Sequence, residues 1–96
     1  MTTIQIEYVG SPGKTHPVNA EKYHAMRTAY LVALPASPPG MTPAEILRSV
    51  TPHLPGELFP GGDKAGWWAK AVQLDLEAKG LVKRAATSPV RLWRNA

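Results

Sequence analysis

Residues 63–80 read DKAGWWAKAVQLDLEAKG. At about 100° per residue, the period of an α-helix, one group of apolar side chains in this stretch shares a single face. Such a stripe predicts a helix that packs this face into the core. Asp63 is a favourable N-cap residue and Gly80 suits the left-handed position after a helix end, so we predict a helix from Asp63 to Lys79. The predicted core face consists of Ala65, Trp68, Ala69, Val72 and Leu76.

The opposite side of this predicted helix carries two further apolar residues, Trp67 and Leu74. A helix that is apolar on two sides is either clamped between elements or used at an interface. Two explanations stay open. An N-terminal hairpin covers both residues, or they contact another protein or a second copy of the chain, because tryptophan is over-represented at interface hot spots. The remaining sides carry Lys64, Lys70, Gln73, Asp75 and Glu77.

The sequence after this helix predicts a basic β-hairpin. Leu76 and Leu81 occupy the two positions that touch in a Schellman motif, so the helix is expected to end at Gly80. Residues 81–85 and 90–94 then have the pattern of two strands joined by a short turn.

The beginning of the chain predicts a strand or hairpin and then a helix. Apolar and polar residues alternate over residues 3–9, as in a half-buried strand. Residues 14–18 can return as a second strand, with Pro17 at an edge or outside the sheet. Asn19 can cap a helix over residues 20–34. The apolar sides of these elements consist of Ile4, Ile6 and Tyr8 in the strand and of Tyr23, Met26, Tyr30, Ala33 and Leu34 in the helix.

The sequence TPAE at residues 42–45 predicts the start of another helix. Thr42 and Glu45 have the spacing of a capping box, and Pro43 suits the first helical position. Pro52 kinks or ends this helix. Its buried side consists of Ile46, Leu47, Val50 and Leu54.

The composition limits the class of protein. The chain has 96 residues, of which 44% are hydrophobic and 19% are charged, and this fits one domain over residues 1–96. The absence of cysteine excludes disulfides, thiolate metal sites and a cysteine nucleophile. No window approaches the roughly 20 apolar residues of a membrane span, and Gln5 and Glu7 interrupt the first apolar run, so we expect a cytoplasmic protein without a signal peptide.

The residue types of catalytic and metal sites do not form recognisable motifs. His16, His24 and His53 do not have the spacing of metal ligands, and no serine has a matching histidine and acid. We therefore expect no catalytic residues, no metal, no cofactor and no small-molecule substrate, and we do not expect an enzyme.

Positive charge is concentrated at the C-terminal end. The chain has a net charge of +4, and residues 64–96 hold seven basic and two acidic residues. A basic segment of this kind is typical of proteins that contact nucleic acids.

Two resemblances follow from these motifs. The order of three helices and a basic hairpin, with LEAKGLVKR at residues 76–84, resembles a winged-helix domain. The whole chain resembles a small family of uncharacterised bacterial proteins, on the sequences FPGG at 59–62, KAGWW at 64–68 and QLDLE at 73–77. The first resemblance implies that the third helix enters the major groove of duplex DNA and that the hairpin contacts the DNA backbone. The residues implied are Lys64, Lys70 and Gln73 on the helix and Lys83, Arg84, Arg91 and Arg94 on the hairpin.

We therefore predict an α+β, winged-helix-like fold, with three helices, an N-terminal strand or hairpin and a C-terminal β-hairpin wing. Two classes of function stay open. One is a nucleic-acid-binding or regulatory module that uses the basic residues. The other is a protein-interaction or self-associating module that uses Trp67 and Leu74, with a protein partner or a homodimer as its product.

Overall fold

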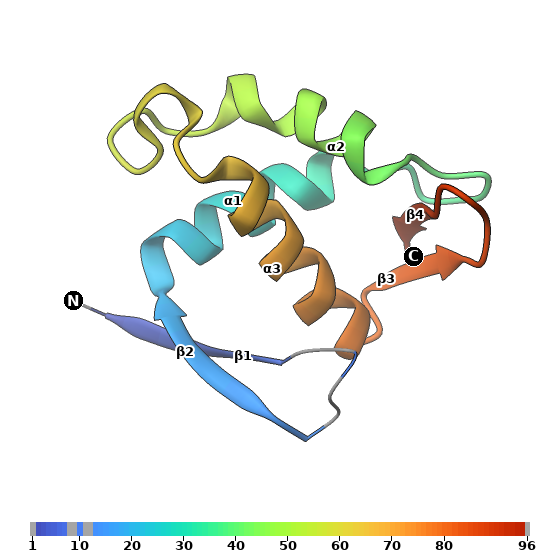
Figure 1. Ribbon diagram of the computed structural model, residues 1–96, viewed down its shortest axis with the longest axis horizontal. Helices are drawn as coiled ribbons and strands as arrows, with labels where there is room; N and C mark the ends of the chain where they lie inside the picture. The colour runs from blue at the N-terminus through green and yellow to red at the C-terminus, as the bar shows by residue number, and fades with distance from the viewer. Residues whose placement is uncertain (1, 8–9, 11–12, 96) are drawn as a thin grey trace.

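The computed structural model describes residues 2–7, 10 and 13–95. Within these residues the chain forms an N-terminal β-hairpin, three α-helices and a C-terminal antiparallel β-hairpin, which confirms the predicted α+β class (Figure 1). Tyr8 and Val9, predicted at the end of the first strand, lie outside the described residues. The helices and strands are β1 (Thr3–Glu7), β2 (Thr15–Asn19), α1 (Ala20–Ala33), α2 (Pro43–Val50), α3 (Ala65–Ala78), β3 (Val82–Ala85) and β4 (Arg91–Arg94).

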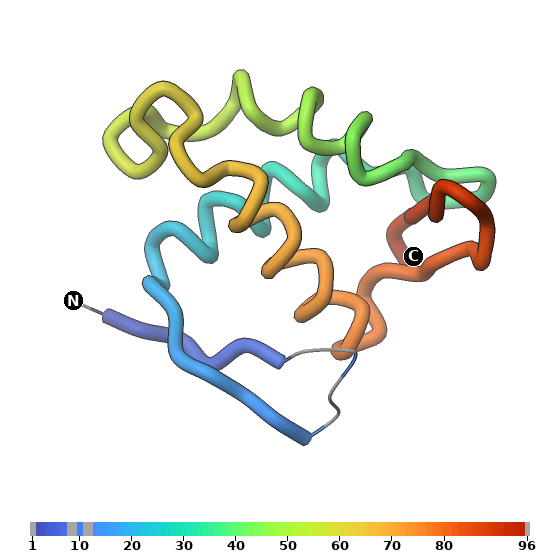
Figure 2. The backbone as a smooth tube through the Cα atoms, viewed as in Figure 1, coloured from blue at the N-terminus to red at the C-terminus, as the bar shows by residue number. Residues whose placement is uncertain are grey.

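Helix α3 lies at the centre of the fold. It contacts α1, α2, β1 and β3, and the chain runs directly from its end into β3 (Figure 2). All five residues of its predicted core face are buried, so this prediction is confirmed. The residues that complete the core include Tyr23, Met26 and Tyr30 of α1, Ile46 and Val50 of α2, Ile6 of β1 and Leu92 of β4.

The N-terminal hairpin packs one of its faces against the helices. β1 and β2 pair antiparallel, with Ile6 opposite His16 and Gln5 opposite Pro17. Ile6 and Val18 are buried while Gln5 is exposed, as the alternating pattern predicts. Pro17 is part of β2, and this is tolerated because each strand of a two-stranded sheet is an edge strand.

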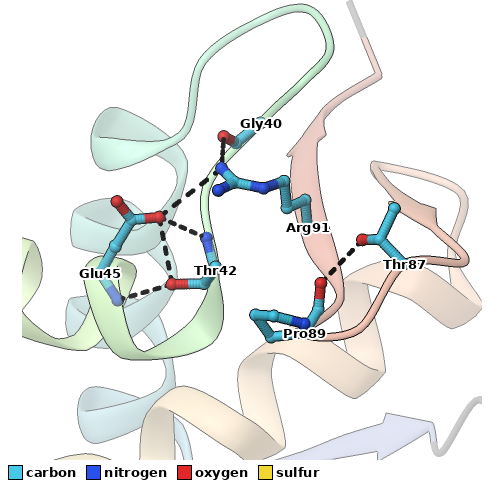
Figure 3. Close-up of polar contacts among 6 residues, drawn as sticks. All are labelled: Gly40, Thr42, Glu45, Thr87, Pro89 and Arg91. Carbon is cyan, nitrogen blue, oxygen red and sulfur yellow. Dashed lines mark hydrogen bonds and ion pairs between the residues drawn. The ribbon is translucent and has the colours of Figure 1, made fainter.

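Local capping motifs determine where α1 and α2 begin. The side-chain oxygen of Asn19 accepts a hydrogen bond of 3.0 Å from the backbone N–H of Lys22. In the capping box of α2, the Thr42 hydroxyl accepts from the backbone N–H of Glu45 at 3.2 Å, and the Glu45 carboxylate accepts from the backbone N–H of Thr42 at 2.9 Å (Figure 3). Both predicted caps are confirmed.

The start of α3 differs from the prediction. The helix begins at Ala65, and Asp63 does not cap it; Asp63 instead follows a 3₁₀ turn over Pro60–Gly62. The backbone of Lys64 has φ = 59°, in the left-handed region, and its side chain makes no capping hydrogen bond. The turn through Gly61 and Gly62, both with positive φ, redirects the chain so that Lys64 occupies the position before the helix.

The end of α3 agrees with the predicted Schellman motif. The backbone N–H of Leu81 donates to the carbonyl of Leu76 at 2.9 Å, and that of Gly80 donates to Glu77 at 3.1 Å. Gly80 has φ = 75°. These are the two hydrogen bonds that define the motif.

The C-terminal hairpin is bound to the connection between α1 and α2. Met41 and Leu92 form a β-bridge, with backbone hydrogen bonds of 2.9 and 2.8 Å in the two directions. Gly40, with φ = 78°, lies so close to this strand that a Cβ atom there would be 2.3 Å from the carbonyl oxygen of Leu92. The guanidinium of Arg91 donates to the carbonyl of Gly40 at 3.2 Å (Figure 3). The hairpin therefore packs against the body of the protein along β4.

Candidate functional site

Asp75 of α3 is a buried carboxylate, with an exposed fraction of 0%. It accepts hydrogen bonds from the hydroxyl of Tyr23, from the backbone N–H of Glu7 at 2.8 Å and from the ammonium of Lys79 at 2.8 Å. The sequence pattern placed Asp75 outside the core face of the helix and did not indicate its burial, which results from its contacts with β1 and α1. Burial, together with the hydrogen bond to Asp75, raises the pKa of Tyr23 above its ordinary value.

Gln73 is also buried, with an exposed fraction of 1%. Its side-chain oxygen accepts from the hydroxyl of Tyr30 at 3.3 Å, and its amide donates to the carboxylate of Glu77 at 3.1 Å. Our prediction that Gln73 faces outward, toward DNA, was therefore wrong: its polar groups bind α1 and α3 instead. Burial raises the pKa of Tyr30 above its ordinary value, and the nearby Glu77 adds to this effect.

Three arginines of the predicted DNA-binding set bind the protein itself. Arg84 donates two hydrogen bonds, of 2.7 and 3.0 Å, to Glu77, whose side chain is 6% exposed. The hydrogen bond to Glu77 raises the pKa of Arg84. Arg91 binds the carbonyl of Gly40, and Arg94 donates to the carbonyl of Leu34 at 3.0 Å. These side chains hold the C-terminal hairpin against the helices.

The three lysines of the predicted set are exposed. Lys64, Lys70 and Lys83 form no hydrogen bond or ion pair through their side chains with residues that the structure describes. Lys70 lies three residues after Trp67 on α3 and is therefore its neighbour on the helix surface, whereas Lys64 is the residue directly before the helix.

Trp67 and Leu74 have different surroundings. The side chain of Trp67 is 55% exposed and packs edge to face on Trp68, with ring centroids 5.0 Å apart. Leu74 is half-buried. Both line a groove of about 310 Å³ between α3 and the N-terminal hairpin. The hairpin therefore covers Leu74 in part and leaves Trp67 open. We call this feature the α3–hairpin groove; its lining consists of Ile6, Glu7, His16, Trp67, Lys70, Ala71 and Leu74.

A second, larger cleft of about 750 Å³ lies between α1 and the segment after α2. Much of its lining consists of small residues of α1, and Val32, which is 81% exposed, also lines it. The sequence patterns did not indicate this cleft, because it depends on how α1 and α2 are arranged. Its lining consists of His24, Ala25, Thr28, Ala29, Val32, Ala33, Ser49, His53 and Pro55.

In the described part of the chain, none of the helices has the length and the apolar character that a membrane span requires. Likewise, within residues 2–7, 10 and 13–95, no three histidine, aspartate or glutamate side chains are close enough together to hold a metal ion.

Comparison with known proteins gives a family and no function. No curated protein and no solved structure matches the chain. One family model, described as a family of unknown function (DUF6958), matches residues 3–92. This agrees with the resemblance to an uncharacterised family. The chain belongs to the DUF6958 family.

Proposed function

We propose that this protein is a protein-interaction module whose contact site is the α3–hairpin groove. The observation that supports the proposal is the exposure of Trp67, 55% of which is open to solvent while its neighbour Trp68 is buried. Burying the rest of this indole against a partner would contribute roughly 3 kcal/mol at 25 cal/mol per Å². Leu74 and Ile6 extend the apolar surface into the groove. Tryptophan beside an apolar groove is typical of interface hot spots.

The polar residues of the larger cleft also favour binding over catalysis. The larger cleft contains Ser49 together with His24 and His53. Among the described residues, however, no hydrogen bond joins this hydroxyl to either imidazole, and no carboxylate lines the cleft to orient one. A serine nucleophile needs such a base and such an orienting group.

Nucleic-acid binding is the second candidate, and one observation favours it: the exposed Lys70 lies beside the exposed Trp67, and Lys64 directly precedes the same helix. A cationic surface around an aromatic ring can bind phosphates and stack on bases. The step from α3 directly into an antiparallel hairpin supports a winged-helix-like arrangement for this role. Against it, Gln73 and three arginines of the predicted set bind the protein itself, and the β1–β2 hairpin lies beside the outer face of α3.

Selection of peptides from a random displayed library tests the first proposal. Wild-type protein is used for selection, and the Trp67→Ala variant is used for counter-selection. We expect soluble peptides that bind the wild type and bind Trp67→Ala at least about tenfold more weakly, as for a hot spot. Val32→Ala, which removes an exposed apolar side chain outside the groove, should bind them as the wild type does. Failure to obtain any peptide that depends on Trp67 contradicts the proposal.

Binding of a labelled DNA duplex distinguishes the second candidate. We expect no binding between roughly 50 and 200 mM salt, the range in which phosphate contacts weaken steeply. Duplex binding that falls steeply over this range and is lost in the Lys64→Ala/Lys70→Ala variant would instead favour the nucleic-acid function.

A further inference from the structure

We infer that the partner of the α3–hairpin groove is a second copy of this chain, in a two-fold symmetric dimer in which Trp67 of each copy enters the groove of the other. This inference rests on the proposed function and names its partner. Three features of the groove support it: its size, the exposed Trp67 in its lining, and the pair of opposite charges that also line it.

The size of the groove suits a large side chain. Its volume of about 310 Å³ lies at the lower end of the roughly 300–1,000 Å³ of pockets that bind small molecules. Trp67 is a large, half-exposed apolar side chain, and it forms one wall of this same groove. In a two-fold interface, residue i of one copy contacts residue j of the other, and j contacts i. In such an arrangement the exposed Trp67 of each copy both lines its own groove and contacts the groove of the other.

The charges of the groove are also self-complementary. Lys70 from α3 and Glu7 from β1 both line it, yet these two side chains are not within ion-pair distance of each other in the described structure. The backbone of Glu7 is fixed in place, because its N–H donates to the buried Asp75. When Trp67 of one copy enters the other groove, Lys70 of that copy approaches Glu7 of the second, and symmetry creates the same pair again. The dimer would thus contain two Lys70–Glu7 ion pairs between its copies.

The expected affinity is modest. The groove and its rim occupy a small part of a total surface of 5568 Å². Interfaces that bury less than about 1,200 Å² in total are typically weak or transient. We expect dissociation constants of roughly 10–100 μM, in the range of such interfaces. The two Lys70–Glu7 pairs should make the affinity fall with salt, but less steeply than nucleic-acid binding does, because most of the contact is apolar.

Sedimentation equilibrium over a wide range of protein concentration tests the inference. The wild type should show a reversible monomer–dimer equilibrium, and Trp67→Ala should weaken it at least about tenfold. Val32→Ala is the matched control and should dimerise as the wild type does, since Val32 does not line the groove. A wild type that is monomeric throughout, or a dimer that Trp67→Ala leaves unchanged, overturns the inference.

Charge-exchange variants test the geometry without removing Trp67. Glu7→Lys and Lys70→Glu each place like charges opposite one another in a homodimer, so each variant alone should dimerise about tenfold more weakly. An equimolar mixture of the two variants should recover dimerisation, because both pairs in the mixed dimer again join opposite charges. Failure of the mixture to recover dimerisation, with both variants folded by circular dichroism, overturns the proposed contact.

The two proposals can fail separately. A monomeric wild type that still binds selected peptides through Trp67 keeps the interaction function and rejects the second copy as partner. A dimer that does not depend on Trp67, together with no peptide that depends on it, rejects both.

Discussion

Asp75 joins three parts of the chain through one carboxylate. It binds the backbone of β1 at Glu7, the hydroxyl of Tyr23 on α1 and the ammonium of Lys79 at the end of α3. Removal of a carboxylate from water is costly unless hydrogen bonds and an opposite charge replace the hydration. Here three donors do so, and the described residues contain no buried side-chain polar atom without a partner. The position therefore requires an acceptor.

The Asp75→Ala variant should lower the free energy of unfolding by about 2–4 kcal/mol. It leaves the hydroxyl of Tyr23 and the N–H of Glu7 without their acceptor, and it removes the hydrogen bond that joins β1 to α3. Urea denaturation measures this change. Lys79→Ala is the control and should cost less than about 1 kcal/mol, because the Lys79 side chain is 35% exposed. Equal losses in the two variants would mean that the ion pair, and not the set of buried donors, provides the stability.

At the scale of elements, the starts of the three helices differ in how far the sequence predicts them. Asn19 and Thr42 cap helices through hydrogen bonds to residues three positions later, so the motif is complete within a few residues. The start of α3 depends on the conformation of Gly61 and Gly62. Because glycine adopts positive and negative φ with similar ease, the sequence does not determine this conformation. Asp63 was for this reason mistaken for a cap.

Thr42→Ala and Asp63→Ala should differ in effect although both were predicted N-caps. The first variant should lose about 1 kcal/mol of unfolding free energy, because it removes the hydroxyl that accepts from Glu45. The second should change the unfolding free energy by less than about 0.5 kcal/mol, since Asp63 is exposed and caps no helix. Thermal or urea denaturation compares them, and a loss of about 1 kcal/mol for Asp63→Ala would contradict the observed start of α3.

The contact between β4 and the α1–α2 connection makes a second comparison possible at this scale. Gly40→Ala should destabilise the protein by more than about 3 kcal/mol, because the added Cβ atom meets the Leu92 carbonyl at 2.3 Å and the residue has positive φ. Gly80→Ala also places alanine at a positive φ, but no other atom lies near the added Cβ atom. This variant should therefore cost only about 1 kcal/mol. If Gly40→Ala were no worse than Gly80→Ala in urea denaturation, β4 would have to move away from the connection at little cost.

At the scale of the whole molecule, the sequence predicted the order of elements and the core face of α3, because apolar periodicity reports directly on burial. It did not predict the burial of Gln73 and Asp75. On an isolated helix these two residues lie outside the apolar face. They become buried only when segments distant in sequence, such as β1 at Glu7, pack against α3. For the candidate site, the sequence identified Trp67, Lys70 and Leu74 but not the hairpin residues Ile6, Glu7 and His16, which line the other side of the groove.

The two buried tyrosines make the stability of the whole molecule sensitive to alkaline pH. Tyr23 and Tyr30 have pKa values raised by burial, whereas the unfolded chain loses these protons near pH 10. Above pH 10 the folded state therefore binds more protons than the unfolded state, and stability decreases as pH rises by about 1.4 kcal/mol per pH unit for each tyrosine. Below pH 10 the contribution is fully present.

Denaturation by urea at a series of pH values above neutrality measures this slope. Tyr30→Phe should reduce it by about half, because one of the two raised tyrosines is then absent. A slope that is the same in wild type and variant would show that Tyr30 does not contribute to the alkaline sensitivity.

The contacts of Arg91 and Arg94 have a consequence for proteins of this size in general. A hairpin that packs against the end of a helix and the connection after it meets carbonyl oxygens, here those of Leu34 and Gly40, that have no partner within a helix. Arginine reaches such oxygens with a long, forked donor, and each use adds one positive charge to the chain. A high isoelectric point can then result from the structural roles of arginine alone. A small basic protein therefore need not bind a polyanion such as a nucleic acid.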